Sequence, residues 1–254
     1  MAIYDRKNHI VGLEKGLGVI ECFDDNNQKL TAAEVARKLN LSRAAARRCL
    51  LTLNYLGYAD YDGKFFRLTV RALRLGYAYL SSTPLPQLLQ LHVERLCDEI
   101  HESCSAAILD NDEVVYVARA TVKRILASGV SVGSRLPAFC TSTGRILLVA
   151  KSTEDARAIL AAANRPHLTP RTVTDVDQIM VLLDRVRIDG YCLVEEELEM
   201  GLLSLSVPVY SSAGVVVAAL NIGVQSQRVS ATQLLEEFLP KLTSIQKTVA
   251  DFIR

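Results

Sequence analysis

Apolar residues recur every three or four positions through the first third of the chain, which is the spacing of amphipathic helices. Thr31 and Ser42 stand where the second and third helices need N-caps. Asp62 and Gly63 then separate two short apolar stretches and predict a type I′ hairpin. Three helices followed by a hairpin indicate a winged helix-turn-helix domain. The predicted helices span residues 13–23, 32–39 and 43–56, and the predicted strands span residues 58–61 and 64–68.

The third predicted helix carries arginines on the face opposite its apolar residues. Arg43 and Arg47 lie one turn apart with Ala44 beside them, and Arg48 lies on the flank. The whole chain has a formal net charge of only +1, so a general excess of positive charge does not explain this density. A ridge of small residues and guanidinium groups fits the major groove of double-stranded DNA. The predicted DNA-binding residues are Thr31, Ser42, Arg43, Ala44, Arg47, Arg48, Lys64 and Arg67, the last two on the wing.

The charge distribution supports this interpretation over a merely solvated helix face. Residues 1–80 carry 13 basic and 8 acidic side chains, whereas residues 81–254 carry 16 basic and 20 acidic side chains. The motif "SSTPLP" at residues 81–86 is expected to interrupt regular structure because it contains two prolines. The sequence therefore predicts three parts: a winged helix domain of residues 1–70, a linker helix and junction of residues 71–86, and a second domain of residues 87–254.

The second domain alternates strand hairpins with amphipathic helices. This mixture predicts an α+β domain built on an antiparallel sheet. The predicted helices span residues 87–101, 141–150, 152–162, 174–190 and 230–253. Thr141 or Ser142 is expected to open the second of them, and Gly190 to end the fourth.

Catalytic and metal-binding motifs are absent from the sequence. The four histidines lack ligand spacing, the six cysteines form no C-x-x-C pair, and the glycine-rich residues 11–18 lack the Lys-Ser/Thr pair of a phosphate-binding loop. The acidic run of residues 195–197 is interpreted as a solvated turn. We therefore expect a binding protein without cofactor or metal. An apolar signal peptide and an apolar membrane span are also lacking, so a cytoplasmic location is expected.

Several longer motifs in order resemble the IclR family of transcriptional regulators over nearly the full chain. They include "SRAAARRCLLTLNYLGY", "VGSRLPAFCTSTGRILLVA" and "DGYCLVEEELEMGLLSLSVPVY". The second and third are most similar to the subgroup that governs the β-ketoadipate pathway and responds to 4-hydroxybenzoate, protocatechuate or β-ketoadipate. The resemblance implies a GAF-like effector domain and homodimers or tetramers. The linker helix could contribute to assembly through Leu73, Tyr77 and Leu80.

The resemblance also implies where a small carboxylic acid, possibly aromatic, binds. The ligand is expected between the sheet and the start of the helix at residues 141–150, where free N–H groups and the helix dipole attract a carboxylate. Val194 stands where some family members carry an acidic residue, which favours a larger or aromatic ligand over a small keto acid. The implied effector-binding residues are Cys140, Thr141, Ser142, Thr143, Gly144, Ser204, Asn221 and Gly223, with Arg119 and Arg124 as candidates to bind the carboxylate.

Three alternatives stay open at this point. The effector could be a different small organic acid, such as a glyoxylate-like acid. The chain could be an enzyme with an accessory DNA-binding domain, which turnover of a candidate ligand would favour. It could also be a constitutive architectural protein, which a DNA complex insensitive to ligands would favour.

Overall fold

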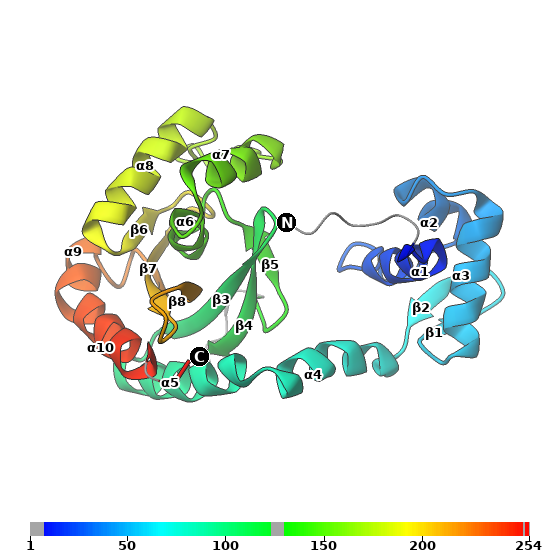
Figure 1. Ribbon diagram of the computed structural model, residues 1–254, viewed down its shortest axis with the longest axis horizontal. Coiled ribbons are helices and arrows are strands. Elements are labelled where there is room, and N and C mark those ends of the chain that lie inside the picture. Colours follow the sequence, from blue (N-terminus) through cyan, green and yellow to red (C-terminus); the bar gives the residue numbers. More distant parts are fainter. Residues whose placement is uncertain (1–7, 123–129, 251, 254) are drawn as a thin grey trace. The chain divides into compact units, whose positions relative to one another are not determined.

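The computed structural model describes residues 8–122, 130–250 and 252–253. The chain forms two compact units, which divide between Tyr79 and Leu80. Figure 1 follows the elements of both units from the N-terminus to the C-terminus. Among the described residues, no helix combines the length and the apolar character needed to cross a membrane.

The first unit has the predicted winged helix-turn-helix fold. A capping box begins the second helix: Thr31 Oγ1 accepts a hydrogen bond from the Glu34 N–H, and the Glu34 carboxylate accepts one from the Thr31 N–H. Ser42 Oγ accepts from the Ala45 N–H and begins the third helix. Both predicted N-caps are confirmed. The elements are α1 (Val11–Glu21), α2 (Ala32–Lys38), α3 (Arg43–Tyr55), β1 (Ala59–Tyr61) and β2 (Phe66–Leu68).

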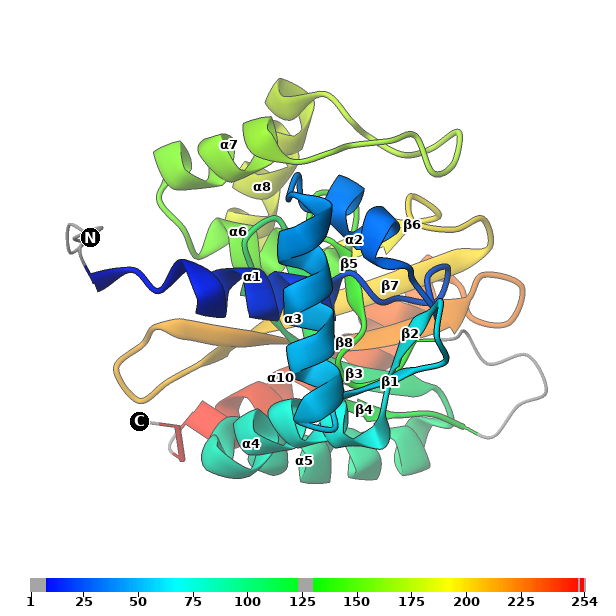
Figure 2. The ribbon, with the colours of Figure 1, turned by 90° about the vertical axis from the view of Figure 1, so that its right-hand side faces the viewer.

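The core of this unit lies between α1, α2, α3 and the hairpin, with Val19, Val35, Leu50 and Phe66 fully buried or nearly so. Figure 2 shows α3 with the β1–β2 hairpin beside it. The apolar spacing of the third helix predicts Leu56 on the same buried face as Ala46, Leu50 and Leu53, but this prediction is wrong because Leu56 is 45% exposed. Leu56 is the C-cap of α3, and it lines an open groove against α1 instead of entering the core.

The hairpin is confirmed, but its predicted two-residue turn is wrong. Tyr61 pairs with Phe66, so four residues connect the strands. The Asp62 carboxylate accepts hydrogen bonds from the N–H groups of Lys64, at 3.0 Å, and Phe65, at 2.8 Å. An aspartate that bonds the backbone two and three residues later stabilises a wider turn, which overrides the Asp-Gly preference for a tight one.

The region around "SSTPLP" is more regular than predicted. A 3₁₀ turn (Val70–Ala72) leads into α4 (Leu73–Ser82), and a single residue separates α4 from α5 (Pro84–Ile100). The expected helix start at residue 87 is therefore wrong. Proline is tolerated in the first turn of a helix, because its missing N–H would have no partner there.

The second unit contains a six-stranded antiparallel sheet with the strand order β5-β4-β3-β8-β7-β6. This confirms the predicted α+β class. A register shift between Ala106 and Ala107 marks an irregularity where β3 pairs with β4. The strands are β3 (Ser103–Asp110), β4 (Glu113–Ala120), β5 (Arg135–Pro137), β6 (Cys192–Glu195), β7 (Leu202–Tyr210) and β8 (Val216–Gln225).

Helices cover both faces of this sheet (Figure 1). On one face, Leu89 and Val93 of α5 pack with Leu242 of α10 over an apolar layer. On the other face, Leu148 of α6 and Leu183 of α8 belong to a second apolar cluster. The remaining bounds are α6 (Ser142–Val149), α7 (Thr153–Ala162), α8 (Val176–Asp189), α9 (Ala231–Gln233), a π-helical turn (Leu234–Phe238) and α10 (Leu239–Ala250).

Candidate functional site

The exposed face of α3 carries the arginines that the sequence singled out. Arg43, Ala44 and Arg47 are exposed, while Ala46 and Leu50 on the opposite face are buried in the core. The helix is thus anchored on one side and free to present guanidinium groups on the other. Arg48 is also exposed, but it lies on a different flank, where it lines the groove between α1 and α3.

The wing presents a second group of cations. Lys64 and Arg67 are exposed, as a role on DNA requires. The Lys64 Nζ lies 5.0 Å from the centre of the Phe65 ring, and the Lys29 Nζ lies 4.9 Å from the same ring. Lys29 was missed by the sequence reasoning because it lies outside both the recognition helix and the hairpin. Arg67 lies 3.8 Å from the Asp62 carboxylate, so part of its charge is balanced within the wing.

In the second unit, one row of residues crosses the sheet on the side of α6. Ser105 pairs with Arg119 on one side and with Asn221 on the other, and Asn221 pairs with Ser206. Directly opposed residues of antiparallel strands share a face of the sheet. Strands β4, β3, β8 and β7 therefore bring an arginine, two serines and an asparagine into one polar row. Ser105 and Ser206 did not emerge from the sequence.

The side chains of Ser105, Asn221 and Ser206 form one buried hydrogen-bonded cluster with Ser204 and with Ser142, the first residue of α6. Ser142 Oγ lies 2.7 Å from both Ser204 Oγ and Ser206 Oγ. Asn221 Nδ2 is a donor within hydrogen-bond distance of three serine hydroxyls. It lies 2.7 Å from Ser204 Oγ, 3.1 Å from Ser206 Oγ and 3.2 Å from Ser142 Oγ. Ser105 Oγ donates to Asn221 Oδ1 at 3.3 Å. Such a polar cluster within a core is costly unless its groups are satisfied.

The start of α6 is closely fixed above this cluster. Thr141 is its N-cap, and Thr141 Oγ1 accepts from the Gly144 N–H at 3.2 Å. A Cβ atom on Gly144 would lie 2.2 Å from the Ala138 carbonyl oxygen, so only glycine permits this approach. Thr143 forms a hydrogen bond with Tyr116, whose burial raises its pKa. Cys140 is fully buried, and burial raises the pKa of its thiol to about 12.

The structure thus brings together Thr141, Ser142, Ser204 and Asn221 from the sequence-based set. Gly223 pairs with Ser204 and flanks the cluster. The Arg119 guanidinium lies 6.0 Å from the centre of the Tyr116 ring, and burial lowers the pKa of this arginine. Arg124 lies outside the described residues.

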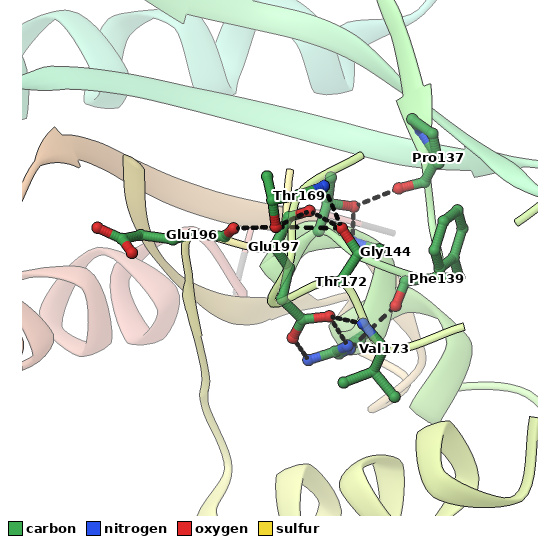
Figure 3. Close-up of polar contacts among 10 residues, drawn as sticks. Pro137, Phe139, Gly144, Thr169, Thr172, Val173, Glu196 and Glu197 are labelled. Atoms are coloured by element: carbon green, nitrogen blue, oxygen red, sulfur yellow. Dashed lines mark hydrogen bonds and ion pairs between the residues drawn. The ribbon is translucent and has the colours of Figure 1, made fainter. Parts of the chain in front are cut away.

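The interpretation of residues 195–197 as a solvated turn is wrong for Glu197. Its carboxylate is buried and forms a bidentate ion pair with Arg145 of α6, at 2.7 and 2.8 Å. Figure 3 shows dashed lines from the Glu197 carboxylate to neighbouring nitrogen atoms, among them the backbone nitrogen of Val173. The signal for this pair is an arginine in the otherwise apolar "ILLVA" helix, because such a charge needs a buried partner.

Within the described residues, no cluster of three or more His, Cys, Asp or Glu side chains is placed to hold a metal ion. The two sites have a different character. One is an exposed cationic helix on a winged helix fold, and the other is a buried polar cluster in an α+β domain. This combination defines a DNA-binding transcriptional regulator with a sensory domain.

Known proteins agree with this class. Residues 12–63 match the IclR helix-turn-helix domain, and residues 77–250 match the C-terminal domain of the bacterial transcriptional regulator IclR. The chain belongs to the IclR family of transcriptional regulators.

Two curated relatives are similar over nearly the whole chain. The Pca regulon regulatory protein of Pseudomonas putida is 42% identical over 239 residues, covering 94% of this chain and 82% of the relative. The p-hydroxybenzoate hydroxylase transcriptional activator of Acinetobacter baylyi is 38% identical over 252 residues, covering 97% of this chain and 93% of the relative. The chain is therefore similar to regulators of aromatic-acid catabolism.

Solved structures give the same result. A Rhodococcus sp. RHA1 protein described as a transcriptional regulator is 42% identical and superposes with a TM-score of 0.81, covering 95% of this chain and 97% of that one. The inducer-binding domain of an Acinetobacter PobR double mutant, in complex with 3-hydroxybenzoic acid, is 34% identical with a TM-score of 0.63. This superposition covers 66% of this chain and 98% of the PobR domain.

Proposed function

We propose that this regulator binds operator DNA through α3 and the wing, and that an aromatic carboxylic acid of the hydroxybenzoate type controls it from the polar row beneath α6. The observation that carries the second part is the alignment of Arg119, Ser105, Asn221 and Ser206 across four strands. This row combines a cation for a carboxylate with hydroxyl and amide groups for a ring hydroxyl.

The surroundings of the row fit an aromatic ring better than a small keto acid. Tyr116, Ala107 and Ala219 form the neighbouring row on one side, and Val194 is buried beside Ser204 on the other. Aromatic ligands need apolar walls of this kind with a few polar groups to orient them. The similarity to regulators named for p-hydroxybenzoate and Pca genes supports the same class of effector.

The effector is expected to enter by exchanging hydrogen bonds with the cluster. Asn221 Nδ2 carries two hydrogens, yet the hydroxyls of Ser142, Ser204 and Ser206 all lie within 3.2 Å of it. The amide cannot donate to all three hydroxyls at once, so a ligand oxygen can replace one of them as an acceptor and leave both amide hydrogens satisfied.

The test is fluorescence anisotropy on the protein's own upstream DNA, at fixed salt, with 4-hydroxybenzoate, protocatechuate and β-ketoadipate. One acid is expected to shift DNA affinity or stoichiometry in the wild type. Ser206→Ala is expected to weaken that response, whereas Ser244→Ala on the exposed surface of α10 is the matched control. DNA binding that ignores all three acids, together with no acid binding by calorimetry, would refute the aromatic-acid proposal.

We also propose that the chain is a homo-oligomer held in part by the first unit. A groove of about 700 Å³ runs between α1 and α3, and its lining includes Leu13, Leu17 and Leu56, which are all more than two-fifths exposed. Such an apolar surface is typical of an interface. Leu17→Glu is expected to shift sedimentation toward smaller species, and an unchanged profile would contradict this role.

A further inference from the structure

The Arg145–Glu197 pair is too buried to be an ordinary ion pair. The Arg145 side chain is 3% exposed and that of Glu197 is 9% exposed. Buried ion pairs seldom stabilise a fold more than apolar residues of the same volume do, because both charges lose their hydration. What a bidentate pair does provide is a fixed geometry between the segments that carry it.

The pair joins segments that are distant in the sequence. Arg145 Nε donates to the carbonyl of Phe139 at 3.1 Å, while its other two nitrogens hold the Glu197 carboxylate. Glu197 Oε2 also accepts from the Val173 N–H at 3.0 Å. The first turn of α6, the segment before it, the loop after β6 and the turn that precedes α8 therefore meet at two side chains.

Two threonines hold the backbone at the Glu197 end of this junction (Figure 3). Thr172 Oγ1 donates to the Glu197 carbonyl at 2.6 Å, and Thr169 Oγ1 donates to the Glu196 carbonyl at 2.7 Å. Glu196 itself has a φ of +58°, a left-handed conformation that non-glycine residues rarely adopt. The backbone at Glu197 is thus held in one conformation by contacts on both sides of it.

Both partners of the pair are close in the sequence to residues that belong to the polar cluster or pair with it. Arg145 follows Ser142 by three residues in α6, so the two side chains leave the same helical turn. Glu197 follows Val194 by three residues, and Val194 pairs with Ser204 in the sheet. A displacement of either partner is therefore transmitted to one member of the Ser142–Ser204 contact, where the hydroxyls lie 2.7 Å apart.

We propose that Arg145 and Glu197 are positioning residues of the effector site, an inference that rests on the proposed function. The pair fixes the first turn of α6 against the end of β6, and so sets the distance between the hydroxyl groups that receive the aromatic acid. Neither side chain needs to touch the ligand.

The decisive variant is R145M/E197M, which removes both charges and keeps the side-chain volumes similar. Single variants such as E197Q leave a buried arginine without its counter-charge, so they report mainly on folding. The matched control is R157M/D177M, which removes the exposed Arg157–Asp177 pair between α7 and α8. The measurements are the thermal midpoint and the affinity for 4-hydroxybenzoate by calorimetry, on the full chain.

We expect R145M/E197M to unfold near the wild-type temperature and yet to bind 4-hydroxybenzoate roughly 10- to 100-fold more weakly, the loss typical when residues that orient ligating side chains are removed. The control should match the wild type in both measurements. Wild-type affinity in R145M/E197M would overturn the proposal, and so would an affinity that falls only in proportion to stability across the variants.

Hydrogen exchange separates this proposal from the proposed function. If the wild type binds no aromatic acid, the proposed effector is wrong, but the positioning role still predicts faster amide exchange at residues 142–146 and 204–206 in R145M/E197M. Exchange in the control should be unchanged. Unaltered exchange at those residues in R145M/E197M would overturn the positioning role whether or not a ligand binds.

Discussion

Replacing Gly144 with alanine adds one methyl group where, among the described glycines, a Cβ would come closest to another part of the chain. The new Cβ would lie 2.2 Å from the Ala138 carbonyl oxygen and 2.3 Å from its Cα. Favourable contacts between non-bonded heavy atoms need about 3.5 Å, so α6 and the segment around Ala138 must separate by roughly 1 Å. Ala138 is 1% exposed, and its surroundings leave little space for that movement.

The cost follows from the hydrogen bonds that hold this segment. Thr141 Oγ1 donates to the Pro137 carbonyl at 2.8 Å, and Arg145 Nε donates to the Phe139 carbonyl at 3.1 Å. Losing both costs about 2 kcal/mol, and steric overpacking costs about 1–3 kcal/mol more. Alanine returns about 1 kcal/mol through its higher helix propensity. We therefore expect Gly144→Ala to lower the free energy of unfolding of the second unit by about 2–4 kcal/mol.

Urea unfolding followed by circular dichroism measures this change. The control is Gly76→Ala in α4, because a Cβ there meets nothing within 4 Å and the substitution should not destabilise the protein. If Gly144→Ala unfolds at the wild-type urea concentration, the start of α6 is not locked against the Ala138 segment. The tight approach would then have no energetic importance.

Three further predictions concern DNA binding, the capping box of α2 and the burial of Cys140. Arg47→Ala should weaken specific DNA binding by about 1–3 kcal/mol and alter the footprint, whereas Lys64→Ala should weaken binding to all sequences and lower the salt slope by roughly one. An unchanged footprint for Arg47→Ala would contradict base reading. Thr31→Ala removes the capping box and should destabilise the first unit by about 1 kcal/mol in urea unfolding, and wild-type stability would refute this. Burial raises the pKa of the Cys140 thiol to about 12, so iodoacetamide at pH 8 should alkylate half-buried Cys49 before Cys140. Mass spectrometry measures the two alkylation rates, and equal rates would refute the burial of Cys140.

The winged helix could be predicted almost completely because its signals are local. Caps at Thr31 and Ser42 act within three residues, and the apolar spacing of α3 defines its buried face without any long-range contact. The turn at Asp62 was mispredicted for the same reason. Two local preferences competed there, and the sequence does not rank a carboxylate–backbone bond against an Asp-Gly turn.

The polar row could be predicted only in part because it depends on strand register. Ser105 and Asn221 are 116 positions apart and meet only when β3 pairs with β8 in one particular register. Arg119 joins them across a strand pair with a register shift, so counting residues along the strands does not align it. Glu197 was missed because an acidic run is usually solvated, and its partner Arg145 lies 52 residues away.

The hydroxyl groups around Asn221 would give the proposed effector site the ability to accept chemically different ligands. A serine hydroxyl turns to donate or to accept, so Ser142, Ser204 and Ser206 present no fixed pattern of donors and acceptors. A site of this kind can meet a phenol, a catechol or a carboxylate by reorienting protons while the heavy atoms stay in place. We therefore expect the replacement of one serine of the proposed effector site to change inducer specificity while the fold of the sheet stays intact.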